Sequence, residues 1–321
     1  MRIKLIVPIS MIQELRTVYL IDKNASYLKS VLTSKFPSIQ FEIGSNLIEA
    51  KGHYGVITFS PGSLINNFSD AIWVHCTGAG IDQLIDVMDF EPKWFTRTVG
   101  KMGNQIGEYV LAYCLLQTQK ILIRKQLQDK KEWHKENAMP TYLFSKSALI
   151  FGTGEIGKSI AKMLSKMGVR CTGVSRTGKT SSEFYKNITV KELKNQTLSE
   201  YDFVIAALPS TKRTEGLLNR DIFDQLEGAL FINVGRGQTV SEKDILDALR
   251  KGNLESAVLD VFESEPLSST SKLWKEPNCI ITPHVSGVTI PNDAAQAFMT
   301  AYKEIASGKV PSSQVNLHAG Y

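Results

Sequence analysis

Three stretches of the sequence carry side chains suited to a small carbonyl compound that has a carboxylate. The stretches FINVGRGQTV, AVLDVFESEPL and CIITPHVSG contain Arg236, Asp260, Glu265 and His284. An arginine can bind a carboxylate through two parallel hydrogen bonds, and a histidine can give a proton to a carbonyl oxygen. A glutamate beside the histidine favours the protonated imidazole. Arg236, Glu265 and His284 thus have the side chains that reduction of a ketoacid by hydride transfer requires.

Each of these residues also has an ordinary structural explanation. Arg236 could form a surface salt bridge, His284 could be a structural histidine, and Glu265 could be a solvated acid. All three, however, follow short apolar runs that are typical of buried strands, and ligands of open α/β sheets collect at the carboxyl ends of the strands. We therefore treat the three residues as one candidate catalytic group.

The string SALIFGTGEIGKSIAKML predicts a nucleotide-binding turn between a strand and a helix. Its Gly152, Gly154 and Gly157 have the spacing G-x-G-x-x-G. In such a turn the first glycine permits the tight bend, the second lets a pyrophosphate approach the backbone, and the third lets helix and strand pack closely. The helix N-terminus adds N–H groups and partial positive charge for the phosphates. The alternative is a structural turn that binds no ligand.

The end of the next strand, VSRT, bears on the choice of cofactor. An NAD site has an acidic residue near this point for the adenosine ribose. This chain has Ser175 and Arg176 instead, with Lys179 close by. A guanidinium can hold a 2′-phosphate, which an acid would repel. We predict a preference for NADP(H), with NAD(H) as the alternative; a solvated Arg176 without this role is the structural explanation.

Residues 147–283 predict a parallel sheet with helices wound on both of its faces. Short apolar runs alternate with longer segments, of which Ile156–Met167 and Ser241–Arg250 have helical patterns. Continuous apolar runs are typical of strands buried on both faces, and their alternation with helices gives a parallel, doubly wound α/β sheet. The expected strands are Ala148–Gly152, Val169–Val174, Phe203–Leu208, Ala229–Val234, Ala257–Val261 and Cys279–Thr282.

The first hundred residues have a weaker pattern of the same kind. We expect a helix at Ala25–Ser34, a long apolar helix at Ile106–Ile123 and a last helix at Asn292–Ser307. The expected strands in this part are Ile3–Ile9, Gln40–Ile43, Tyr54–Phe59 and Ala71–Cys76.

Length and composition fit a globular protein of two domains. The chain has 321 residues, of which 43% are hydrophobic and 21% charged, and this argues against disordered, collagen-like and coiled-coil proteins. The net charge of +5 is spread along the chain, so we expect no nucleic-acid surface. No apolar run reaches the ~18 residues of a membrane span, and we interpret the N-terminal residues as a strand and not as a signal peptide. The four widely spaced cysteines argue against a disulfide scaffold or a zinc site and fit the cytoplasm.

In order and spacing, several motifs resemble those of the D-isomer-specific 2-hydroxyacid dehydrogenases. Besides the glycine fingerprint they are TGAGID, AALPST, NVGRG, LDVFESEP and TPHVSG, which lie between about Cys76 and the C-terminus. The resemblance implies that Arg236 binds substrate, that His284 is the acid/base residue and that Glu265 is its acid partner. It also implies that backbone N–H groups of Ala79 and Gly80 receive the substrate carboxylate.

The same resemblance implies a set of cofactor contacts. Asp260 matches the aspartate that holds the nicotinamide carboxamide, and Glu155 and Ile156 match positions along the pyrophosphate. Two departures from the family pattern are present: the acid that selects NAD is missing, and Gly235 stands where many relatives have a small side chain. The further expected contacts are Leu208, Pro209, Val234, Gly235, His284 and Ser286.

The family implies two Rossmann-like domains with a cleft between them. Residues 1–100 and 286–321 would form the substrate (catalytic) domain, and residues 101–285 the dinucleotide-binding domain. Relatives form dimers through the segment after the first crossover between domains. We therefore expect a homodimer whose surface includes the helix Ile106–Ile123 and the loop with Trp133 and Tyr142.

The chain resembles most the branch of NADPH-dependent glyoxylate/hydroxypyruvate reductases. KMGNQIGEYV, VSRT and the closing Ala319-Gly320-Tyr321 carry that likeness. We therefore predict reduction of a small 2-ketoacid to the D-2-hydroxy acid with NAD(P)H and without a metal. The alternatives are an NAD-linked phosphoglycerate or D-lactate dehydrogenase and a weakly catalytic, nucleotide-sensing interaction protein. Many phosphoglycerate dehydrogenases carry a C-terminal regulatory domain, for which we expect this chain to be too short.

Overall fold

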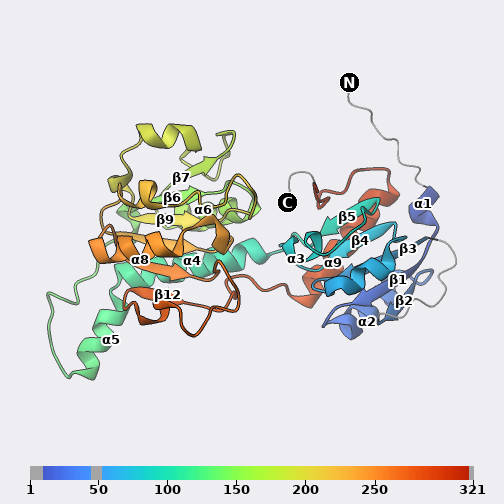
Figure 1. Cartoon of the computed structure of the whole chain (residues 1–321), viewed down its shortest axis with the longest axis horizontal. Helices are drawn as coiled ribbons and strands as arrows, with labels where there is room; N and C mark the ends of the chain where they lie inside the picture. The colour runs from blue at the N-terminus through green and yellow to red at the C-terminus, as the bar shows by residue number, and fades with distance from the viewer. Residues whose placement is uncertain (1–9, 45–52, 318–321) are drawn as a thin grey trace. The chain divides into compact units, whose positions relative to one another are not determined.

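The chain folds into two compact units, each built on its own parallel sheet (Figure 1). The computed structural model describes residues 10–44 and 53–317. Unit 1 comprises the chain up to Lys101 and from Thr289 onward, and unit 2 comprises Met102–Val288. The chain therefore enters unit 2 once and returns to unit 1 once.

Unit 2, which lies wholly within the described residues, contains a seven-stranded sheet whose neighbouring strands are all parallel. Its order is β12-β11-β10-β9-β6-β7-β8, so the direction of winding reverses between β6 and β9. In such sheets, ligands bind beyond the carboxyl ends of the strands at this reversal. The strands are β6 Ser147–Phe151, β7 Arg170–Ser175, β8 Lys186–Thr189, β9 Phe203–Ala206, β10 Ala229–Asn233, β11 Leu254–Leu259 and β12 Cys279–Ile281.

Helices cover both faces of this sheet because its central strands are apolar on both sides. Every residue of β6, β9 and β10 is buried. One face packs on α4 (Met102–Thr118) and α6 (Glu155–Lys166), and the other packs on α7 (Arg220–Phe223) and α8 (Glu242–Lys251). The predicted doubly wound α/β fold is thereby confirmed for this unit.

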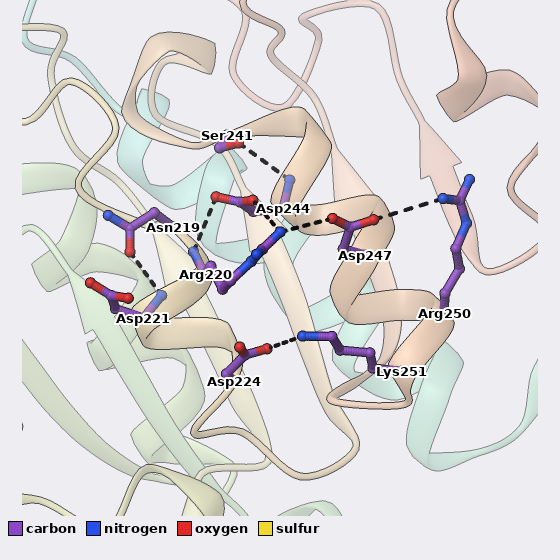
Figure 2. Close-up of polar contacts among 9 residues, drawn as sticks. All are labelled: Asn219, Arg220, Asp221, Asp224, Ser241, Asp244, Asp247, Arg250 and Lys251. Atoms are coloured by element: carbon purple, nitrogen blue, oxygen red, sulfur yellow. Dashed lines mark hydrogen bonds and ion pairs between the residues drawn. The ribbon is translucent and has the colours of Figure 1, made fainter.

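Polar contacts hold α7 against α8, as Figure 2 shows. The guanidinium of Arg220 lies 3.2 Å from a carboxylate oxygen of Asp247, and the backbone N–H of Arg220 donates to Asp244 at 3.1 Å. Lys251, at the end of α8, lies 2.8 Å from Asp224. Ser241 caps α8 by accepting a hydrogen bond from the N–H of Asp244. The start of α8, which follows the loop of Arg236, is therefore fixed against α7.

The described part of unit 1 contains a five-stranded parallel sheet with the order β2-β1-β3-β4-β5. Residues of α2 (Ala25–Lys35) and α9 (Pro291–Ala306) pack with one buried cluster of this sheet, and the 3₁₀ helix Gly62–Phe68 packs with the other. Two short helices are α1 Ser10–Gln13 and α3 Asp82–Ile85. The strands are β1 Leu15–Ile21, β2 Gln40–Ile43, β3 His53–Thr58, β4 Trp73–Cys76 and β5 Trp94–Arg97.

One predicted element differs from the structure. The predicted helix Ile106–Ile123 is wrong as a single element: α4 ends at Thr118 and α5 (Ile121–Asp129) begins after Lys120, whose φ of +49° is left-handed and breaks the helix. The predicted strand Ile3–Ile9 lies outside the described residues. Strands β1, β5 and β8 were not predicted.

None of the helices in the described part of the chain is long and apolar enough to cross a membrane.

Candidate active site

Gly152 and Gly157 are required by the way β6 passes into α6. At Gly152 φ is +103°, and a Cβ there would lie 2.5 Å from the carbonyl oxygen of Ala207, just after β9. At Gly157 a Cβ would lie 1.8 Å from the carbonyl oxygen of Gly152. Both glycines are therefore explained by the packing of the protein against itself.

Gly154, which immediately precedes α6, has no such requirement. Its φ is −75°, and a Cβ there would meet no heavy atom of the described residues within 4 Å, chain neighbours aside. This open space lies at the N-terminus of a 12-residue helix, where N–H groups and the helix dipole attract phosphate. Glu155 and Ile156 form the first turn of that helix. The residues present thus fit the pyrophosphate of a dinucleotide.

A basic turn follows β7. The hydroxyl of Ser175, the last residue of the strand, accepts a hydrogen bond from the N–H of Gly178 at 3.1 Å and so closes the turn. Arg176 and Lys179 are exposed in it, and the segment 175–180 (SRTGKT) has no acid in its sequence. The turn can therefore present positive charge to an anionic group at the end of β7.

Arg236 lies in a tight loop after β10, and the side chain of Asn233 holds that loop. Its Oδ1 accepts from the N–H of Gly235 at 3.1 Å, and its Nδ2 donates to the carbonyl oxygen of Arg236 at 3.3 Å. The hydroxyl of Thr239 donates to the same carbonyl oxygen at 2.6 Å. A Cβ on Gly235 would lie 2.6 Å from the carbonyl oxygen of Leu208. The glycine that departs from the family pattern is therefore what lets the loops after β9 and β10 lie together.

His284 and Glu265 form a hydrogen-bonded pair. His284 Nδ1 lies 2.8 Å from Glu265 Oε2, and the two side chains are 45% and 35% exposed. The second carboxylate oxygen, Oε1, accepts from the N–H of Phe262 at 3.1 Å. Because Glu265 engages Nδ1, Nε2 is the nitrogen that can exchange a proton with a bound molecule.

Asp260 is completely buried and holds the loop that carries His284. Its Oδ1 accepts from the hydroxyl of Thr282 at 2.5 Å and from the N–H of Val285 at 2.8 Å, and its Oδ2 accepts from the N–H of Ser286 at 2.8 Å. Its backbone oxygen accepts from the N–H of His284, whose φ is +55°. In the structure Asp260 therefore positions this loop, while its expected contact with the nicotinamide carboxamide stays a prediction.

The remaining expected residues of unit 2 lie at the same edge of the sheet. Leu208 and Pro209 are half-buried after β9, and Val234 is buried after β10. Ser286, also buried, follows β12 in the loop of His284. Each expected catalytic or cofactor residue of this unit thus follows a strand or, as in Ser175, ends one.

The expected carboxylate-binding loop belongs to unit 1, where it follows β4. The carbonyl oxygen of Ala79 accepts from Nη1 of Arg97 at 2.8 Å. The hydroxyl of Thr77 donates to Asp22 at 2.6 Å, which ties the loop to the end of β1. Ala79 and Gly80 are both partly exposed. The loop is therefore held at a defined position on its own sheet.

Sequence reasoning missed Tyr109 and Thr282. The hydroxyl of Tyr109, on α4, lies 2.7 Å from the hydroxyl of Thr282. Thr282 precedes Pro283 and His284, so its place next to the candidate acid/base residue was a usable signal. The sequence contained no such signal for Tyr109, because this residue lies in an apolar helix 173 residues before Thr282.

Comparison with known proteins places this geometry in a family. Residues 111–286 match the model of the D-isomer specific 2-hydroxyacid dehydrogenase NAD binding domain. Glyoxylate/hydroxypyruvate reductase A of Serratia proteamaculans is 28% identical over 306 residues, which cover 93% of this chain and 97% of that protein.

Solved structures also resemble nearly the whole length of the chain. A D-isomer specific 2-hydroxyacid dehydrogenase family protein from Aeromonas salmonicida has a TM-score of 0.84 and 30% identity, and the match covers 94% of this chain and 99% of that one. An NADPH-dependent glyoxylate/hydroxypyruvate reductase from Sinorhizobium meliloti, in complex with NADP and sulfate, has a TM-score of 0.81 and 26% identity, with 95% and 100% covered.

The matched model spans more than half of the chain and includes the glycine turn, Arg236, Glu265 and His284. The resemblance seen in the sequence is thereby confirmed. The chain belongs to the D-isomer specific 2-hydroxyacid dehydrogenases, NAD(P)-binding oxidoreductases that act on CH–OH groups.

Proposed function

We propose that this protein reduces a small 2-ketoacid of the glyoxylate/hydroxypyruvate type to the D-2-hydroxy acid with NADPH. The observation that carries the proposal is the 2.8 Å contact between His284 Nδ1 and Glu265 Oε2, in the same unit as the glycine turn. With Nδ1 held by the carboxylate, Nε2 is the ring nitrogen from which the imidazolium can donate a proton.

Each side chain of the catalytic group has one step to perform. Arg236 binds the substrate carboxylate through paired hydrogen bonds, which sets the orientation of the adjacent carbonyl group. His284 Nε2 donates a proton to the carbonyl oxygen as the alcohol forms, and Glu265 stabilises the charged ring before that transfer. In the oxidation direction the neutral ring takes the proton back. Ala79 and Gly80 bind the carboxylate through backbone N–H groups.

The nucleotide site of the proposal consists of loops at the carboxyl edge of the unit 2 sheet. When bound, the reduced nicotinamide supplies the hydride. The turn at Gly154 and the first residues of α6, Glu155 and Ile156, hold the pyrophosphate. Asp260 and Ser286 hold the nicotinamide end. The remaining residues that we assign to the cofactor are Gly152, Gly157, Ser175, Arg176, Leu208, Pro209, Val234, Gly235 and His284.

The preference for NADPH rests on the turn after β7. Arg176 is exposed in a segment without acids, and its guanidinium can pair with a 2′-phosphate. The Sinorhizobium meliloti reductase, described as NADPH-dependent and in complex with NADP, supports the same choice. NADH is the weaker alternative in this proposal.

We further propose that the protein is a homodimer that forms through the segment after α4. None of the nine residues of α5 is buried, and Ile121 and Leu122 are each 47% exposed. Trp133 is 98% exposed and Tyr142 74% exposed in the segment that follows. A second copy of the chain would cover these apolar side chains. We place the enzyme in the cytoplasm because its four cysteines are free.

The test is a panel of 2-ketoacids assayed with NADPH and NADH side by side. We expect NADPH to be oxidised with glyoxylate and with hydroxypyruvate, and the glycerate formed from hydroxypyruvate to be the D enantiomer. NADPH binding without reduction of any ketoacid would contradict the proposal and favour a nucleotide-sensing protein. Faster turnover with NADH than with NADPH would contradict the cofactor assignment alone.

A further inference from the structure

One residue, Asp260, accepts several of the hydrogen bonds that anchor the loop of His284. Asp260 accepts the backbone N–H groups of His284, Val285 and Ser286, the first with its carbonyl oxygen and the other two with its carboxylate. It also accepts the hydroxyl of Thr282. Since His284 has a φ of +55°, which an L-residue rarely adopts, these bonds maintain a backbone conformation that is unfavourable by itself.

The direction of the hydrogen bonds around Thr282 follows from its chemistry. A hydroxyl has a single proton, and a carboxylate can only accept, so Thr282 gives its proton to Asp260 over 2.5 Å. The 2.7 Å contact between the hydroxyls of Thr282 and Tyr109 must then be donated by the phenol. Tyr109 therefore holds the hydroxyl of Thr282 in the orientation that serves Asp260.

The position of Tyr109 is itself fixed by packing within α4 and between α4 and α6. Its ring contacts that of Tyr113 one turn later in α4, with 4.7 Å between the ring centroids. The same helix packs closely on α6, where a Cβ on Gly107 would lie 3.4 Å from Met163. Burial raises the pKa of Tyr109, so the phenol keeps the proton that it donates.

We propose that Tyr109 is a positioning residue for the acid/base histidine and acts through Thr282 and Asp260. The chain of bonds from Tyr109 to Asp260 fixes residues 282–286 on α4, and thereby fixes the ring of His284 against Glu265. The inference deepens the proposed function and rests on it for its kinetic part. Its structural part, that Tyr109 anchors residues 282–286 in the free protein, does not depend on the proposed function.

The first test measures backbone amide exchange in the free protein. In Tyr109→Phe the ring stays and the donor is lost, so we expect the N–H groups of Val285 and Ser286 to exchange about 10-fold faster. Thr282→Val, which lacks the hydroxyl, should behave in the same way, and Thr282→Ser, which keeps it, should match the wild type. Tyr185→Phe is the matched control, because Tyr185 is 78% exposed on the same unit. Wild-type exchange rates in Tyr109→Phe would overturn the inference.

The second test measures ketoacid reduction with NADPH. We expect Tyr109→Phe to lower kcat about 10-fold with little change in the KM for NADPH, and to raise the solvent isotope effect on kcat, because proton donation becomes slower. A partly unfolded sample would lower kcat without moving the isotope effect. The double variant Tyr109→Phe, Thr282→Val should lose no more than either single variant, since both break the same chain of bonds.

The outcomes separate this inference from the proposed function. If the wild type reduces no ketoacid, the proposed function fails, while the exchange rates still decide whether Tyr109 holds the loop. Exchange could become faster in Tyr109→Phe while kcat and the isotope effect stay unchanged. Tyr109 would then hold the loop of residues 282–286, but proton donation by His284 would not depend on that contact. That result, too, would overturn the positioning role.

Discussion

Gly237 lies directly against Phe262: a Cβ on the glycine would be 1.8 Å from the carbonyl carbon of the phenylalanine. Gly237 follows Arg236, and Phe262 donates its N–H to Glu265, so this contact joins the loops of two catalytic candidates. A further bond joins the same loops, since the side chain of Gln238 donates to the carbonyl oxygen of Glu263 at 3.0 Å. The N–H of Glu263 donates to Glu242, the first residue of α8, at 2.9 Å.

Gly237→Ala should therefore separate these two loops. The added methyl group overlaps with backbone, which cannot rotate away, so we expect a loss of about 2 kcal/mol or more in the free energy of unfolding. Activity should fall further than stability explains, because Arg236 and Glu265 move apart. Thermal unfolding and steady-state kinetics on the same sample check both effects. An Ala variant as stable and active as the wild type would show that the loops are not in such close contact.

The glycine turn offers a pair of matched substitutions. Gly157→Ala should destabilise unit 2, since its Cβ would lie 1.8 Å from the carbonyl oxygen of Gly152. Gly154→Ala should leave the unfolding midpoint unchanged, because the space around it is open. It should weaken NADPH binding by about 10-fold or more, because the methyl group would occupy the place of a phosphate oxygen. Calorimetric titration with NADPH measures the second effect, and unchanged affinity would remove the pyrophosphate from this position.

Substitutions of His284 and Glu265 should lower activity to different extents. His284→Ala should lower kcat by on the order of 10² or more, the scale of general acid–base catalysis. Glu265→Gln keeps a side chain that can accept from Nδ1 but removes its charge, and we expect a loss of about 10-fold. His53→Ala is the control, since His53 lies in unit 1 and pairs with Glu14 at 3.5 Å. Turnover at the wild-type rate in His284→Ala would exclude the histidine from the mechanism.

Cofactor choice should depend on Arg176. We expect Arg176→Asp to raise the dissociation constant for NADPH by on the order of 10²-fold and to change that for NADH much less, since NADH has no 2′-phosphate to repel. Arg170→Asp, at the opposite end of the same strand, supplies a control with the same change in charge. Equal effects of Arg176→Asp on the two nucleotides would mean that the residue does not contact the 2′-phosphate.

A buried histidine in unit 1 makes stability depend on pH. His75 Nδ1 lies 2.8 Å from the hydroxyl of Thr96, which also accepts from the indole N–H of Trp73. Burial lowers the pKa of His75 from 6.5 to about 3. Between these values the unfolded chain binds a proton that the folded chain does not, so the folded state loses stability as pH falls.

The contribution of neutral His75 to the free energy of unfolding is fully present above about pH 6.5, and it declines as the pH falls toward 3. At pH 5 we expect the loss to be about 2 kcal/mol relative to pH 7.5. Urea unfolding of the wild type and of His75→Gln at the two pH values isolates the contribution of His75 to the pH dependence of stability, because glutamine does not titrate. Equal losses in the two proteins would assign the pH dependence to other groups.

The central strands were predictable because they depend on local sequence. β6 and β10 are buried on both faces and therefore appear as unbroken apolar runs. Arg236, Glu265 and His284 could be proposed from the sequence because each follows such a run. The parallel order of the strands then requires that all three lie at one edge of the sheet.

The missed features depend on tertiary contacts. β8, with the sequence KNIT, has only one buried residue and forms a strand because it pairs with β7. The break at Lys120 involves neither glycine nor proline. The bond between Tyr109 and Thr282 joins residues that the sequence separates widely. Pairing and packing of this kind leave no periodic signal in the residues themselves.

The exposure of α5 has a consequence for how the protein should be handled. A nine-residue helix that buries none of its residues is marginal in water, so we expect the surface of a second copy in the proposed homodimer to stabilise it. If the proposed homodimer forms through this segment, trypsin should cleave the dilute protein at Arg124, Lys125, Lys130 or Lys131 faster than the concentrated protein. The rate of cleavage in this segment would then serve as a simple gauge of assembly.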